Sequence, residues 1–258
     1  MNDLIKSIFK PSELDFGAIP SITSEEIQLR IELAIAYRLV GMNAWDDHIY
    51  THISAAIKGS GGAYLINPFG LLFSEVAPNN LAKVNLQGEI LYGDSINKTG
   101  FMIHGAVHRH RPDAKCVIHL HNVSSIAVSA LPQGLLPISQ HALRFYQDMS
   151  YCDYSGLAID DKFEKVLISN LADKNAMLLR NHGSLVCGSS VQQAFYLMDT
   201  LNKACEIQLL LGNSAVLQPS PSVCKLTFKQ LLQDGPEEGQ IEWPAYVRKL
   251  LAFQKNLT

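Results

Sequence analysis

Two histidines lie two residues apart in the segment CVIHLHN, residues 116–122, which is otherwise apolar and predicts a β-strand. Histidine is a poor core residue, because both ring nitrogens need hydrogen-bond partners when they are buried. Alternate residues of a strand point to the same side, so His119 and His121 would present two imidazoles to one point. That is the arrangement that two ligands of one zinc ion need, with nitrogens at about 2.0–2.1 Å from the ion.

A pair of histidines at this spacing is a weak signal by itself, so a third ligand is needed. The segment LLRNHGSLVCG supplies His182 at the end of another apolar strand, in a tight turn before Gly183. Three neutral imidazoles leave one coordination position open, which is typical of a catalytic rather than a structural zinc site. The sequence therefore predicts a site for Zn²⁺, or another divalent metal, at His119, His121 and His182.

Helices and short strands alternate along the chain and would position these histidines. Thr23 and Glu26 predict a capping box at the start of a helix that Gly41 would close, and Ser190 would cap a long helix after the last histidine. Pro112 would end a helix just before the histidine strand. The expected helices cover residues 22–41, 99–110, 123–131 and 191–212, and the expected strands cover 48–57, 63–68, 70–75, 82–87, 88–93, 116–122 and 175–188. This alternation predicts one α/β or α+β domain.

Composition excludes several classes of protein. The 258 residues are 47% apolar and 17% charged, with a formal net charge of −3 and no basic block, so neither nucleic acid nor an anionic membrane surface is an expected partner. There is no apolar run of about 18 residues and no secretory signal, and the five cysteines form no CxxC motif. A reduced, cytoplasmic protein is expected. The predicted organisation is an N-terminal arm (1–22), one domain (23–217), and a C-terminal arm (218–258) that packs on the domain or on a neighbouring subunit.

The segments VIHLHN and LLRNHG, with the long helix after them, resemble the class II aldolase/adducin family from about Ala44 to Gly212. LINPFGLLFSEV and GLLPIS look most like the adducin head domain and its bacterial relatives. The resemblance implies a three-layer αβα sandwich around a central, mostly antiparallel sheet. It also implies zinc on the three histidines, a small-molecule substrate, and a homotetramer with active sites at subunit interfaces.

The sequence departs from the family's aldolases at the acid that transfers the proton. The glutamate that these aldolases carry before the histidine strand aligns with Gly100, which cannot transfer a proton. Their phosphate-binding positions align with His52, with Phe69 before Gly70, and with Lys98 and Thr99. A tyrosine that follows the PI turn in the family corresponds to His141. Cleavage of ordinary sugar phosphates is therefore not expected.

Other side chains are candidates for the missing roles. His104 lies one helical turn beyond Gly100 and would share its face, either as a proton-transfer residue or as a packed histidine. His141 is the second catalytic candidate, and Gln140, His52 and Gly70 are candidates for substrate contact. His108 and His110 are expected at a solvated helix end.

Two functions fit these observations. The first is a zinc-dependent enzyme that acts on a small hydroxy-carbonyl compound, with lyase, decarboxylase or epimerase chemistry and without the family's glutamate. The alternative is a non-catalytic, oligomeric, adducin-like scaffold. A third interpretation is that the histidines hold only a structural metal, in a metalloprotein without turnover. The chain has no long basic tail of the kind that adducins use for partner binding, which favours the small-molecule role.

Overall fold

A computed structural model describes residues 2–157, 161–212, 214–233 and 235–256. Within these residues the strands form one eight-stranded sheet in the order β4-β3-β2-β1-β5-β8-β7-β6. The strands are β1 (His52–Ala56), β2 (Tyr64–Ile66), β3 (Ala82–Val84), β4 (Ile90–Tyr92), β5 (Cys116–Leu120), β6 (Met149–Cys152), β7 (Ala176–Leu179) and β8 (Gly183–Gly188). Among the described strands only β6 and β7 pair in parallel, and every other neighbouring pair in the sheet is antiparallel, as predicted.

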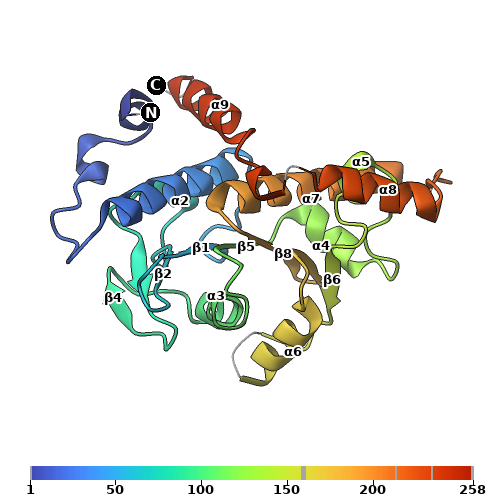
Figure 1. Ribbon diagram of the computed structural model, residues 1–258, viewed down its shortest axis with the longest axis horizontal. Coiled ribbons are helices and arrows are strands. Elements are labelled where there is room, and N and C mark those ends of the chain that lie inside the picture. The colour runs from blue at the N-terminus through green and yellow to red at the C-terminus, as the bar shows by residue number, and fades with distance from the viewer. Residues whose placement is uncertain (1, 158–160, 213, 234, 257–258) are drawn as a thin grey trace.

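Helices cover both faces of this sheet. The α-helices are α1 (Asn2–Ile8), α2 (Ser24–Met42), α3 (Lys98–His110), α4 (Val123–Ala130), α5 (Gln140–Leu143), α6 (Asp161–Leu171), α7 (Val191–Leu211), α8 (Pro221–Leu231) and α9 (Trp243–Lys255). α2 and α7 lie along one face of the sheet, and α3 and α6 lie along the other (Figure 1). The expectation of a three-layer αβα sandwich is confirmed.

The alternation of side chains along β1 and β5 assigns residues to the two faces. Ile53 and Ile118 belong to the main core with α2 and α7, whereas Val117 packs with α3 and α6. His52 and His119 alternate with these apolar residues and so share the α3 side of the sheet. The central strands therefore carry a conventional apolar core on one face and imidazoles on the other.

The start of α2 is as predicted, and its end is not. Thr23 caps the helix, because its hydroxyl accepts from the Glu26 backbone N–H at 3.2 Å. The Glu26 carboxylate does not complete a capping box; it pairs with Arg30 at 2.9 Å and Lys83 at 2.8 Å. Gly41 does not close the helix, which continues to Met42 and ends at Asn43.

Two predictions of strands are wrong. Residues 70–75 contain a short 3₁₀ helix, η2 (Phe73–Glu75), because the Glu75 carboxylate accepts from the Leu72 backbone N–H at 2.8 Å and closes a turn. The apolar segment 175–188 forms two strands, β7 and β8, with a tight turn between them.

The prediction that Ser190 caps α7 is confirmed, since its hydroxyl accepts from the Gln193 N–H at 3.1 Å.

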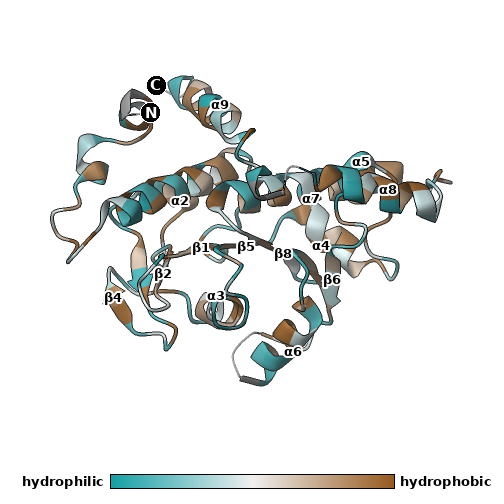
Figure 2. Cartoon of the chain, in the orientation of Figure 1, coloured by the Kyte–Doolittle hydropathy of each residue, from teal (hydrophilic) through white to brown (hydrophobic). Residues whose placement is uncertain are grey.

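The two ends of the chain lie near each other. α1 and α9 pack together, and α9 also packs against α2, while α8 packs against α5 (Figure 1). α9 carries hydrophobic and hydrophilic segments side by side, as expected for a helix with one face on the protein (Figure 2). In the described part of the chain no helix is long and apolar enough to cross a membrane. The five cysteines are free and buried.

Candidate metal centre

The three predicted histidines converge at one edge of the central strands. His119 lies in β5, His121 follows the end of β5, and His182 lies in the turn between β7 and β8. One nitrogen from each ring lies within 4.8 Å of the others. The His121 and His182 Nε2 atoms are 3.0 Å apart, and the ring centroid of His119 is 5.0 Å from that of His121 and 4.8 Å from that of His182. We call these residues the histidine triad.

Hydrogen bonds fix which nitrogen two of these rings turn inward. His119 is buried, and its Nδ1–H donates to the backbone carbonyl of Ser184 at 3.0 Å. His121 Nδ1–H donates to the carboxylate of Asp47 at 2.9 Å. A neutral imidazole that donates from Nδ1 carries a lone pair on Nε2. Both rings are therefore held in the tautomer that a metal ligand requires, with a carbonyl or carboxylate behind the ring.

The donor set fits a divalent metal ion. The Nε2 lone pair of His121 faces Nε2 of His182 at 3.0 Å, so two nitrogens converge on a position that a proton or a cation must fill. Two nitrogens bound to one tetrahedral zinc ion at about 2.1 Å lie about 3.4 Å apart, which is close to this separation. Three imidazoles suit zinc and several other divalent transition metals, so the set indicates a class of ion rather than one metal.

Burial keeps the rings of His119 and His182 neutral. Burial, followed by the charge of His121, lowers the pKa of His182 to about 4. Burial, followed by the charges of His182 and His121, holds the pKa of His119 well below its usual value. A neutral imidazole is the form that binds metal, so His119 and His182 are ready to act as ligands at neutral pH.

The turn that carries His182 needs a special backbone. Asn181 has a positive φ of 58°, a conformation that asparagine tolerates better than most residues. Gly183 follows, and a Cβ at this position would collide with the Leu120 carbonyl and lie 3.3 Å from His121 Cδ2. Arg180 anchors the turn by donating to the carbonyls of Ser129 at 3.0 Å and Leu131 at 2.7 Å. Glycine at 183 therefore lets β8 approach β5 closely enough for His182 to meet His121.

Two further buried histidines lie behind the triad. His52 of β1 is the cross-strand partner of His119, and the two rings stack with centroids 6.0 Å apart. His104 of α3 meets the His52 ring edge-on at 5.6 Å. Both nitrogens of His52 and Nε2 of His104 are buried without a hydrogen-bond partner among the described residues. Burial lowers the pKa of His52 to about 3 and that of His104 well below its usual value, so both rings are neutral.

His108 corrects one expectation from the sequence. It was expected at a solvated helix end, but its Nε2 lies 2.7 Å from the Ser54 hydroxyl, which also contacts His104 Nδ1 at 2.6 Å. The His108 ring packs on Tyr64 with centroids 4.7 Å apart. His110, by contrast, is exposed. One face of α3 thus packs imidazoles against β1, because its helical period returns every fourth residue to the sheet.

The remaining predicted site residues lie in different surroundings. Gln140 and His141 are exposed on α5, which packs against α7 and α8. Gly70 is exposed with a φ of 96°, and Phe69 before it is 42% exposed. The structure therefore brings His52 and His104 to the triad, whereas Gln140, His141 and Gly70 lie on the surface of this chain.

Asp47 and Ser184 are the contributors that the sequence did not single out. Ser184 contributes only a backbone carbonyl, which no residue pattern marks. Asp47 lies in the segment WDDHIYTHIS, residues 45–54, which leads into β1. Its sequence could have indicated a contact with the triad only because two adjacent acids precede a strand that carries a histidine.

Comparisons with known proteins bear on the family and the fold of this chain. Residues 31–209 match the family model of the Class II Aldolase and Adducin N-terminal domain. An aldolase II superfamily protein from Pseudomonas syringae is 40% identical, with a TM-score of 0.85 over 89% of this chain and 94% of that one. An L-fuculose 1-phosphate aldolase from Glaciozyma antarctica shares the fold, with a TM-score of 0.81, 24% identity, and 95% and 97% coverage.

Mouse alpha-adducin is also similar. It is 47% identical over 187 residues, which is 70% of this chain and 25% of the adducin. The segment that the two proteins share is thus about a quarter of the length of the adducin.

Proposed function

This chain belongs to the class II aldolase and adducin family, and we propose that it is a metal-dependent enzyme acting on a small hydroxy-carbonyl compound. The reaction class is lyase, decarboxylase or epimerase chemistry next to a carbonyl group. The observation that carries the proposal is the convergence of three imidazoles, two of which donate from Nδ1 to Asp47 and to the Ser184 carbonyl and so turn Nε2 inward.

The residues divide into those that hold the ion and those that surround it. His119, His121 and His182 would hold zinc or another divalent ion, which when bound supplies a positive charge that polarises a carbonyl oxygen. Asp47 orients His121 through Nδ1. His52 has a neutral ring whose nitrogens have no hydrogen-bond partner in the described part of the chain, which supports a role in hydrogen bonding to a substrate hydroxyl.

His104 is the proposed companion of His52. Its Nδ1 contact with the Ser54 hydroxyl leaves Nε2 available on the side of His52. The Ser54 hydroxyl lies between His104 Nδ1 and His108 Nε2 and has one proton to donate. When it donates to the nitrogen of one ring, the nitrogen of the other ring must carry a proton and donate to Ser54. The protonation of the two rings is therefore coupled. This coupling supports His104 as the residue that exchanges a proton near the site.

The proposed partners are a small-molecule substrate and further copies of this chain in a homotetramer. Val123, two residues beyond His121, is 81% exposed, and α5 presents Gln140 and His141 on the surface. Membership of the family supports the oligomer, and a subunit contact beside the triad would bury Val123. In such an assembly His141, Gln140 and Gly70 act on a substrate bound at the triad of a neighbouring copy.

Similarity to alpha-adducin favours one alternative, a non-catalytic oligomeric scaffold. Its 47% identity over 187 residues exceeds the 24% identity with the fuculose phosphate aldolase.

Metal content and turnover distinguish the two functions. Zinc-loaded and chelator-treated protein would be incubated with small hydroxy-carbonyl compounds, and released aldehyde, ketone or CO₂ would be measured. Metal-dependent product supports the enzyme, whereas a metal-bound, intact oligomer without turnover on the panel supports the scaffold.

A further inference from the structure

We propose that the C-terminal arm, residues 218–258, is a positioning element of the metal centre. α9 braces the loop 43–51, which it contacts at Asn43, and this loop holds Asp47 against His121. The inference rests on the metal centre proposed above, and it assigns a role to a segment outside residues 31–209, the part that matches the family model.

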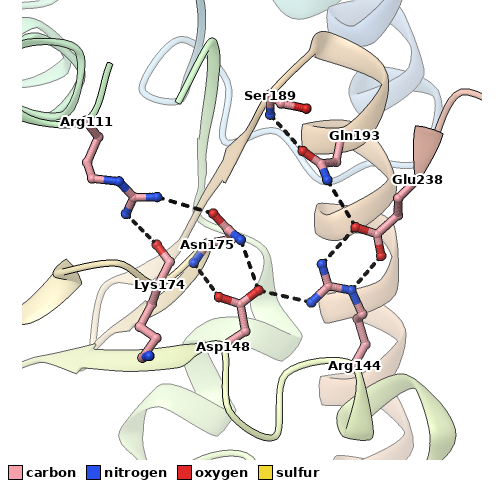
Figure 3. Close-up of polar contacts among 8 residues, drawn as sticks. All are labelled: Arg111, Arg144, Asp148, Lys174, Asn175, Ser189, Gln193 and Glu238. Atoms are coloured by element: carbon pink, nitrogen blue, oxygen red, sulfur yellow. Dashed lines mark hydrogen bonds and ion pairs between the residues drawn. The ribbon is translucent and has the colours of Figure 1, made fainter. Parts of the chain in front are cut away.

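A buried ion-pair network fastens the arm to the domain (Figure 3). Both nitrogens of the Arg144 fork donate to the Glu238 carboxylate, at 2.5 and 2.8 Å, and Gln193 Nε2 donates to the same carboxylate at 3.2 Å. Arg144 also pairs with Asp148 at 3.0 Å. Arg144 is 2% and Glu238 is 6% exposed, so detaching the arm would remove one of the two carboxylates that pair with the Arg144 guanidinium. The arm is therefore held at a fixed point just before α9.

The chain turns closely onto α7 after this point. A Cβ at Gly239 would lie 2.5 Å from the carbonyl oxygen of Gln192, and Gly239 has a φ of 84°, so glycine is required here. Trp243 then begins α9, and its ring lies edge-on to Phe195 with centroids 6.0 Å apart. On the other side Phe195 meets Trp45 at 6.0 Å. Three aromatic rings thus connect the start of α9 to the loop 43–51.

Further along, α9 contacts the same loop directly. Lys249 Nζ donates to the Asn43 side-chain oxygen at 3.2 Å. Asp46 lines a cavity of about 220 Å³ together with Leu250 and Gln254 of α9. The loop is therefore bordered by α9 at Asn43 and Asp46 and supported through Trp45.

The loop needs such support because its backbone is strained. Ala44 and His48 have positive φ values of 54° and 51°, a region that costs about 1 kcal/mol or more for residues other than glycine. Asp47 lies between them with its side chain 43% exposed, so burial of the carboxylate does not fix its position. The orientation of Asp47 toward His121 then depends on the packing of the loop around it, to which α9 contributes.

The test measures metal affinity in full-length variants, by competition between the protein and a chromophoric chelator for Zn²⁺. Trp243→Ala removes one of the two α9 rings that contact Phe195, the other being Tyr246 with ring centroids 4.9 Å apart. Ile241→Ala is the matched control, since Ile241 is an exposed apolar residue of the same arm. We expect about tenfold weaker zinc binding in Trp243→Ala, as for loss of a group that orients a ligand, and no change in Ile241→Ala. Unchanged affinity in a folded Trp243→Ala protein would overturn the proposal.

A double variant shows whether the arm acts through Asp47. In an Asp47→Ala background, Trp243→Ala should weaken zinc binding no further, because the carboxylate that the arm positions is already absent. Additive losses would mean that the arm affects the site by another route and would contradict the inference. Lys249→Ala provides a milder second variant if Trp243→Ala does not fold.

A measurement on metal-free protein separates this inference from the proposed function. Backbone hydrogen exchange in residues 43–51 should be faster in Trp243→Ala than in wild type and Ile241→Ala, while exchange in β5 and β8 stays unchanged. If the wild type binds no zinc, the proposed metal centre fails, and the exchange data still decide whether α9 braces the loop. Equal exchange in all three proteins would refute the bracing itself.

Discussion

The ring of His52 fills the space next to Gly100. A Cβ at Gly100 would lie 2.7 Å from His52 Cδ2, 2.8 Å from Nε2 and 2.9 Å from Cγ. Gly100 is in the first turn of α3, and His52 is the cross-strand partner of His119. Space for an acid at position 100 and space for an imidazole at position 52 are therefore mutually exclusive in this packing.

The first prediction compares two helical glycines. Gly100→Ala should destabilise the protein by about 1–3 kcal/mol, because His52 is buried between β1 and α3 and must shift. Gly41→Ala in α2 should be neutral or stabilise by up to about 1 kcal/mol, since its nearest neighbour lies at 3.6 Å, an ordinary contact. Urea unfolding of both variants is the measurement. Equal effects would show that His52 does not restrict position 100.

The second prediction concerns restoring the acid. Gly100→Glu alone should gain no lyase activity, because its side chain meets the His52 ring. Combined with His52→Ala, the carboxylate has room, and general acid–base help of about 10²–10⁴-fold becomes available. Zinc-loaded wild type, both single variants and the double variant would be assayed with fuculose-, rhamnulose- and ribulose-phosphate-like substrates. Strong cleavage by the wild type would contradict the view that the glutamate is required for this reaction.

The third prediction concerns the triad and its support. His121→Ala should lose zinc almost completely, because it removes one of three ligands, while Asp47→Ala should bind zinc about 10–100-fold more weakly. Asp153→Asn, a change at an exposed acid, is the control and should keep wild-type affinity. Metal analysis after dialysis against a chelator measures all three. Full zinc content in His121→Ala would exclude the proposed site.

The fourth prediction is that acid destabilises the metal-free protein. Burial lowers the pKa of His108 from 6.5 to about 4, and that of His52 from 6.5 to about 3. Below pH 6.5 and above these lowered pKa values, the unfolded chain binds protons at these two histidines that the folded chain does not. The stability that these neutral rings contribute is present above pH 6.5 and is lost as the pH falls toward 4, with a slope approaching about 1.4 kcal/mol per pH unit for each histidine.

Urea unfolding of metal-free protein at several pH values measures this slope. His108→Gln should reduce it, because one partly buried ring with a lowered pKa is removed. His110→Gln is the control, because His110 is exposed. A wild-type stability that does not change between pH 7 and 5 would be inconsistent with buried neutral histidines.

The fifth prediction concerns the attachment of the arm. Glu238→Gln should destabilise the protein by about 3 kcal/mol, because it leaves the buried Arg144 fork without its carboxylate (Figure 3). Glu237→Gln, at the exposed neighbouring position, should change stability by less than about 0.5 kcal/mol. Thermal unfolding of the two variants provides the comparison, and equal melting temperatures would count against the ion pair as the attachment.

The sequence by itself determined the parts that depend on local pattern. The apolar alternation placed His119 and His52 in strands, and the hydroxyls of Thr23 and Ser190 marked the starts of α2 and α7, because strand period and N-caps act over a few residues. The convergence of His182 with His119 and His121 could also be expected, since an open three-histidine set is a recurrent ligand pattern. Local pattern failed where one side chain redirected the backbone, as Glu75 does at η2.

Only the tertiary structure decided what surrounds the triad. Asp47 reaches His121 across 74 residues of sequence, and His52 meets Gly100 where β1 packs on α3. His108 was expected in solvent and is instead packed against Ser54 and Tyr64. Each of these contacts depends on how two elements are placed relative to each other, a property that neither segment encodes alone. The histidines are a local feature of the sequence, and their orientation is a property of the fold.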